Sequence, residues 1–245
     1  SRARFEPPSV PKVRTFTYLV FVFKLGPYLM EKRGPLQIKP LLIVYNSFKV
    51  INSAMLKNRG ILSITVKFPQ LIHGLLLQTI AVLYWKYMVT KILDLFDTIF
   101  FVLRKKQSQI TFLHVYHHVF MVIISWSSLK YDPSDHWAFM AVVNCLIHTL
   151  MYTYYGLSAM GPSYAKYLWW KKYVTIMQLV QFVLVSTHIV IQTYSSQCPM
   201  HAGTYWVGLF NLILFVILFA DFYKKRYAAQ GSKQGIEFVC TRHAD

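Results

Sequence analysis

The feature that most constrains this chain is a series of apolar stretches, each long enough to cross a membrane as a helix of about 20 residues. The whole chain is 55% hydrophobic and only 14% charged, whereas a soluble domain carries roughly 25% charged residues. This composition excludes a disordered chain, a disulfide-rich secreted module and most soluble folds. It indicates an all-α membrane protein.

Seven stretches are candidate transmembrane helices. They fall in one domain, 15–223, between an N-terminal tail (1–14) and a basic C-terminal tail (224–245). The first two stretches each contain a lysine, Lys24 and Lys49, and the sequence before the third has few turn signals. We predict the spans at about 15–30, 40–56, 78–103, 111–128, 136–158, 173–194 and 204–223.

The charge of the chain bears on its orientation. The formal net charge is +17, but the basic residues fall between the apolar stretches, which favours membrane topology over nucleic-acid binding. If the spans alternate, loops 31–39, 104–110 and 159–172 and the tail from Lys224 hold 14 basic residues, against eight in the opposite loops and the N-terminal tail. Because cytosolic loops are rich in Lys and Arg, we predict that these loops and the C-terminus are cytosolic.

A histidine box, HxxHH, opens the fourth span. Its members His114, His117 and His118 share one face of a helix, because residues three and four apart lie close together around its axis. Three neutral imidazoles suit a metal ion, or they supply a base, an acid and an acyl acceptor. A simpler interpretation is a set of interfacial histidines that contact lipid headgroups.

Three other spans also place polar side chains on one face. Intramembrane ionisable groups are costly and face the protein interior. The carboxylates of the third span either hold helices together or accept an N–H from a box histidine. The polar groups of the fifth and sixth spans either link helices or line a site. The three sets are Lys91, Asp94, Asp97 and Thr98; Asn144, His148, Tyr152 and Tyr155; and Thr175, Gln178, Gln181 and His188.

Four polar faces on four helices predict one buried polar chamber that opens toward the basic cytosolic rim. Behind it the spans are Leu, Ile, Val and Phe. Such a chamber suits a long amphiphile with a phosphorylated head, whose phosphates basic rim residues would bind. The rim lysines that we expect to do so are Lys166, Lys171 and Lys172.

These motifs, in this order and spacing, resemble the very-long-chain fatty acid elongases (3-oxoacyl-CoA synthases) over residues 26–223. The matching stretches are GPYLMEKR at 26–33, YN at 45–46, KILDLFDT at 91–98 for the family's KxxExxDT, LHVYHH at 113–118, NCLIHTLMYTYY at 144–155 for NxxxHxxMYxYY, and TIMQLVQ at 175–181 for TxxQxxQ. One residue departs from the motifs: Asp94 stands where the family pattern has glutamate.

The resemblance implies a seven-helix protein of the endoplasmic reticulum membrane, with six helices around a tunnel closed at the lumenal end. Its reaction would condense a long-chain acyl-CoA with malonyl-CoA, giving a 3-oxoacyl-CoA two carbons longer, CO2 and free CoA. It implies no cofactor, metal or nucleic-acid partner. It leaves open a homodimer and contact with other enzymes of the elongation cycle.

The resemblance also implies roles for the site residues. No cysteine lies in the box to act as a thiol nucleophile, so we expect His117 to attack the acyl thioester. His148 would bind or polarise the reacting carbonyls, while His114 and His118 orient groups and carry protons. Residues expected to hold the box are Lys91, Asp94 and Asp97. Those expected to contact substrate are Asn144, Tyr152, Tyr155, Gln178, Gln181 and His188.

Two other functions compete with this one. A membrane di-iron desaturase or hydroxylase also uses histidine boxes, but it needs about eight histidines in several boxes, and this chain has one box and otherwise isolated histidines. A seven-helix transporter without chemistry would also explain intramembrane lysine and aspartate. The sequence does not define the acyl chain length or unsaturation that the site accepts.

Overall fold

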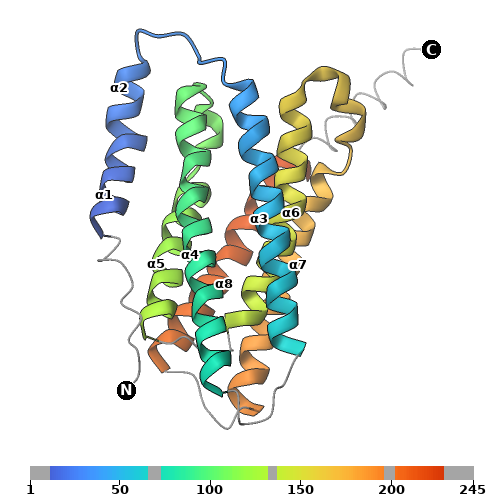
Figure 1. The fold of residues 1–245 in the computed structure, drawn as a ribbon. Helices are drawn as coiled ribbons and strands as arrows, with labels where there is room; N and C mark the ends of the chain where they lie inside the picture. Colours follow the sequence, from blue (N-terminus) through green and yellow to red (C-terminus); the bar gives the residue numbers. More distant parts are fainter. Residues whose placement is uncertain (1–11, 66–72, 132–136, 196–201, 229–245) are drawn as a thin grey trace, which may run out of the picture. The chain divides into compact units, whose positions relative to one another are not determined.

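The computed structural model describes residues 12–65, 73–131, 137–195 and 202–228, and every regular element in these ranges is helical (Figure 1). The chain forms two compact units, Ser1–Tyr164 and Ala165–Asp245. The first unit contains α1 (Lys12–Val20), α2 (Gly26–Met30), α3 (Lys39–Thr65), α4 (His73–Leu103), α5 (Phe112–Tyr131) and α6 (Ala138–Met160). The second contains α7 (Lys171–Ser195) and α8 (Ala202–Tyr223).

Three of the described helices are long and apolar enough to cross a membrane: Phe112–Tyr131, Lys171–Ser195 and Ala202–Tyr227. A shorter apolar helix covers Thr15–Met30. Over the residues that the structure describes, the chain is therefore all-helical with membrane-spanning character, as the composition predicts.

The predicted boundaries are close to the observed ones except at two ends. α3 continues to Thr65, nine residues beyond the predicted end of the second span. α4 begins at His73, five residues before the predicted start of the third. Residues 60–65 and 73–78 continue these helices, and residues 66–72 lie outside the described ranges. The prediction that part of 60–78 lies at the membrane interface or packs outside the span, made because so long a helix exceeds what one crossing needs, is not tested by this continuity. A glycine costs a helix only about 1 kcal/mol, so Gly60 does not stop α3.

A wider helical turn, Phe21–Leu25, joins α1 to α2. Pro27 has no backbone N–H, and its ring displaces the carbonyl four residues earlier. The N–H of Gly26 therefore bonds to the oxygen of Phe21, five residues back. Gly26 is also required for packing, since a Cβ there would lie 2.7 Å from Cγ1 of Val102 on α4.

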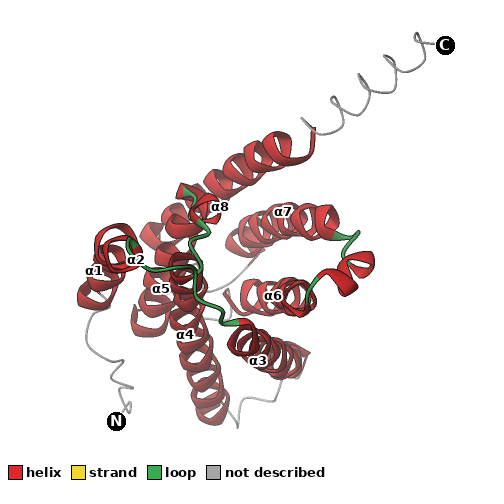
Figure 2. Ribbon diagram, turned by 90° about the horizontal axis from the view of Figure 1, so that it is seen from above, coloured by secondary structure: helices red, strands yellow, loops and turns green. Residues whose placement is uncertain are grey.

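In the first unit α3 lies along α6 and α4 lies along α5 (Figures 1 and 2). An apolar cluster draws on all four helices, and its buried members are Leu56, Tyr87, Met121, Ile124 and Cys145. A second cluster, Tyr18, Val22 and Val115, attaches α1 to α5. These contacts fix the rotation of the helices about their axes, and hence where their polar faces point.

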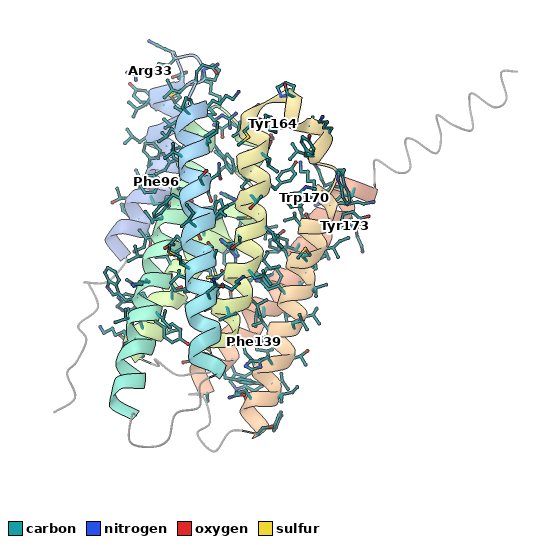
Figure 3. The ribbon with its side chains drawn as sticks, turned by 45° about the vertical axis from the view of Figure 1, so that its right-hand side comes forward. Arg33, Phe96, Phe139, Tyr164, Trp170 and Tyr173 are labelled. Carbon is teal, nitrogen blue, oxygen red and sulfur yellow. The ribbon has the colours of Figure 1, made fainter. Side chains whose placement is uncertain are left out.

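The basic loops of the first unit meet at one end of its helices. The N–H of Leu36 bonds to the oxygen of Leu103 at 3.0 Å, and Nζ of Lys105 bonds to the oxygen of Glu31 at 3.3 Å. Figure 3 shows Arg33 and Tyr164 at this end and Phe139 at the opposite end. The prediction that loops 31–39 and 104–110 share one side is confirmed. That this side is cytosolic stays a prediction.

Candidate active site

A carboxylate on α4 is the centre of a buried ionic cluster in the first unit. Asp94 is only 1% exposed. One oxygen, Oδ1, forms an ion pair with Nζ of Lys49 on α3 and accepts a hydrogen bond from the Tyr152 hydroxyl at 3.0 Å. The other, Oδ2, lies 3.3 Å from Nζ of Lys91 and 3.7 Å from Nδ1 of His148 on α6. Asp94 thus connects three helices.

The formal charges of this cluster cancel. Lys49 and Lys91 are balanced by Asp94 and Asp97, all buried. The hydroxyl of Tyr152 lies between the two carboxylates, 3.0 Å from Oδ1 of Asp94 and 2.7 Å from Oδ2 of Asp97. Buried charges are tolerated when they are paired and hydrogen-bonded in this way.

Lys91 connects the ionic cluster to polar side chains of α6. Its Nζ donates to Oδ1 of Asn144 at 2.6 Å and lies 3.4 Å from Nε2 of His148. The Tyr87 hydroxyl also donates to Oδ1 of Asn144, at 3.0 Å. An ammonium group only donates, so Nε2 of His148 accepts and the ring proton sits on Nδ1, facing Asp94. The structure thus brings together the predicted polar faces of the third and fifth spans. The side-chain oxygen of Asn144 is occupied by its hydrogen bonds within this cluster.

The histidine box belongs to α5. It faces α4 at Thr98, one helical turn beyond Asp94. The rings of His114 and His118 are 4.3 Å apart, and those of His117 and His118 are 5.6 Å apart. The prediction that the three imidazoles share one face is therefore confirmed.

A hydroxyl, rather than the expected carboxylate, orients the first box histidine. Oγ1 of Thr98 lies 2.9 Å from Nε2 of His114, and the Tyr18 hydroxyl on α1 donates to the same Oγ1 at 2.7 Å. Consecutive helical residues point about 100° apart. Asp97 consequently faces Tyr152 on α6 while Thr98 faces α5.

The predicted substrate residues are only partly placed. Tyr155 is 40% exposed, and its ring centroid lies 6.2 Å from that of Tyr152. The predicted substrate residues on α7 belong to the second unit. Gln181 is buried, and Gln178 and His188 are half-buried. That they meet the histidine box stays a prediction. The rim lysines also belong to the second unit, and all are exposed: Lys166, Lys171 and Lys172.

Sequence reasoning missed three members of the site, Lys49, Tyr18 and Tyr87. A signal for Lys49 was available, because a lysine inside an apolar stretch needs a buried anion. The polar face of the third span also offered two carboxylates, Asp94 and Asp97, against the single cation of Lys91. No comparable signal marks Tyr18 or Tyr87 among the 17 tyrosines.

The arrangement suits acyl chemistry on imidazole, with fixed positive charge and hydrogen-bond donors one helical turn away. Within the ranges that the structure describes, no group of three or more His, Cys, Asp or Glu side chains is placed to hold a metal ion.

Comparison with known proteins covers nearly the whole chain. A family model described as ELO: GNS1/SUR4 family matches residues 5–235. The chain is 36% identical to very long chain fatty acid elongase 7 of Drosophila melanogaster, over 97% of this chain and 74% of that protein. It is 40% identical to very long chain fatty acid elongase 7 of Rattus norvegicus, over 86% of this chain and 78% of that protein. It is 38% identical to very long chain fatty acid elongase 4 of Homo sapiens, over 86% and 68%.

Proposed function

The chain belongs to the ELO: GNS1/SUR4 family, and on that basis we propose that it is a condensing enzyme of fatty acid elongation, a 3-oxoacyl-CoA synthase. It joins a long-chain acyl-CoA to malonyl-CoA and releases a 3-oxoacyl-CoA two carbons longer, CO2 and free CoA. The observation that carries this proposal is the placement of the histidine box beside the buried cluster of Lys91, Asp94 and His148.

Condensation makes two chemical demands that this site meets. The acyl group must be held as an electrophile, and negative charge that develops on thioester oxygens must be stabilised. An acyl-imidazole is a reactive electrophile, and imidazole is the nucleophile that the box provides. The ammonium of Lys91, 3.4 Å from Nε2 of His148, supplies fixed positive charge.

We propose a ping-pong sequence on His117. Its imidazole attacks the acyl thioester carbonyl, the C–S bond breaks, and CoA leaves as the thiol after taking a proton. Malonyl-CoA then loses CO2, and the electron pair of the broken C–C bond attacks the acyl carbonyl, which expels the imidazole of His117. His114 and His118 move protons, and the positive charge of Lys91, held beside His148, polarises the reacting carbonyls.

The membrane architecture that we propose has seven crossings, with six helices around a tunnel, in the endoplasmic reticulum and with a cytosolic C-terminus. In support, α3, α4 and α6 have 27, 31 and 23 residues, enough to span the roughly 30 Å hydrocarbon core. Of the residues expected to contact substrate, Asn144 and Tyr152 are buried and bonded to the ionic cluster. Those that we assign to substrate along the tunnel and its rim are Tyr155, Gln178, Gln181, His188, Lys166, Lys171 and Lys172.

Expression in yeast microsomes tests the function. With labelled malonyl-CoA and a series of acyl-CoA substrates, we expect label to enter acyl chains two carbons longer than those supplied, above the level in microsomes without the chain. A transporter without chemistry predicts no added label for any acyl-CoA, and that result would refute the proposal. The series also reports the chain length and unsaturation accepted.

The contact between Thr98 and His114 leads to a milder prediction. Valine at position 98 removes the hydroxyl that holds Nε2 of His114 and that accepts from Tyr18, at nearly unchanged volume. We expect condensation to fall about tenfold and the free energy of unfolding to fall by about 1 kcal/mol, the net contribution of a hydrogen bond. Thr98→Ser keeps the hydroxyl and should stay near the wild-type rate. Equal loss in both variants would contradict the assignment.

A further inference from the structure

Lys49 is the most deeply buried cation of the first unit that the structure describes, with no exposed surface. Its Nζ forms the ion pair with Asp94 and donates to the backbone carbonyl oxygen of Thr90 at 3.1 Å. It also lies 5.1 Å from the ring centre of Tyr152. A buried ammonium is strongly unfavourable unless it is paired and hydrogen-bonded. Its partners are all protein groups of α4 and α6, so it does not serve as a contact for substrate.

The two oxygens of Asp94 have separate partners. Oδ1 is taken by Lys49 and Tyr152, while Oδ2 faces Lys91 and Nδ1 of His148. Lys91 lies on the same helix as Asp94, three residues earlier. Without the ion pair to Lys49 on α3, the carboxylate of Asp94 is free to rotate, and Oδ2 loses its fixed position beside both Lys91 and His148.

We propose that Lys49 is a positioning residue, which holds Oδ1 of Asp94 so that Oδ2 faces His148. This inference rests on the proposed function. It also explains how aspartate, whose side chain is one methylene shorter, can face His148 at position 94, where the family pattern has glutamate. A glutamate carries its carboxylate one C–C bond further and reaches His148 without being held from α3.

The test uses four purified full-length proteins: wild type, Lys49→Met, Asp94→Glu and the double variant. We expect Lys49→Met to lower kcat roughly tenfold, within the range of coupling between contacting residues, with KM for acyl-CoA unchanged. The double variant should recover to within about threefold of wild type, since glutamate no longer needs Lys49. A role in folding alone would reduce the yield of folded protein and leave kcat per folded enzyme unchanged.

Lys57→Met is the matched control, because Lys57 lies on α3 two turns beyond Lys49 and is partly exposed; its kcat should equal that of wild type. A wild-type kcat in Lys49→Met, or a loss that Asp94→Glu does not recover, overturns the proposal. If Lys49→Met does not accumulate folded, the double variant is compared with Asp94→Glu. Equal or higher kcat in the double variant supports the proposal, and a tenfold further loss overturns it.

A second readout does not depend on activity. The unfolding temperatures of the four proteins should be non-additive, with Asp94→Glu compensating part of the loss caused by Lys49→Met. Additive shifts overturn the proposal. If wild type forms no 3-oxoacyl-CoA, the proposed function fails, while the unfolding temperatures still decide whether Lys49 acts through Asp94.

Discussion

Replacing His117 by alanine is expected to abolish condensation, with a loss of at least roughly a thousandfold, as for other enzymes that lose their nucleophile. The acyl-imidazole cannot form, so the purified variant incubated with acyl-CoA alone should show no acyl adduct by intact-protein mass spectrometry and should release no CoA. Expression should stay close to normal, because His117 is half-buried and the ionic cluster is unchanged.

His73→Ala is the control for this experiment. His73 is the first residue of α4, about 37 Å along the helix from Thr98 at 1.5 Å per residue. This variant should keep both the adduct and condensation. An acyl adduct that persists in His117→Ala would show that another residue is the nucleophile.

Asp94→Asn should have the second largest effect, and it should affect stability as well as activity. The variant leaves Lys49 and Lys91 buried, with Asp97 as the one remaining carboxylate of the cluster. Removing one partner of a buried ion pair typically costs about 3–5 kcal/mol. We expect a lower unfolding temperature in detergent, poor accumulation and no condensation.

An exposed ion pair at the C-terminal end of α8 provides the comparison. Nζ of Lys225 lies 2.8 Å from Oδ2 of Asp221, and their side chains are 76% and 54% exposed. Exposed pairs contribute about 0–1 kcal/mol, so Asp221→Asn should unfold close to wild type. Equal unfolding temperatures for Asp94→Asn and Asp221→Asn would contradict the assignment of a tightly coupled buried cluster.

The parts of the site that could be predicted are those set by spacing along a single helix. The three histidines share a face because they are three and four residues apart, and that expectation holds. Lys91 and Asp94 on α4 meet Asn144 and His148 on α6 because buried polar faces have nowhere else to pair.

The rest depends on the rotation of neighbouring helices, which periodicity does not determine. Lys49 reaches Asp94 because the packing of α3 along α6 and α4 turns that face of α3 inward. Thr98, rather than its neighbour Asp97, meets His114 for the same reason.

The central claim is that this chain forms a carbon–carbon bond between two thioesters, and it is tested by the purified protein with long-chain acyl-CoA and malonyl-CoA and no reductant. The account predicts a 3-oxoacyl-CoA two carbons longer, with equal amounts of CO2 and free CoA, detected by mass spectrometry. Unchanged acyl-CoA at every chain length supplied, with folded protein present, would contradict it.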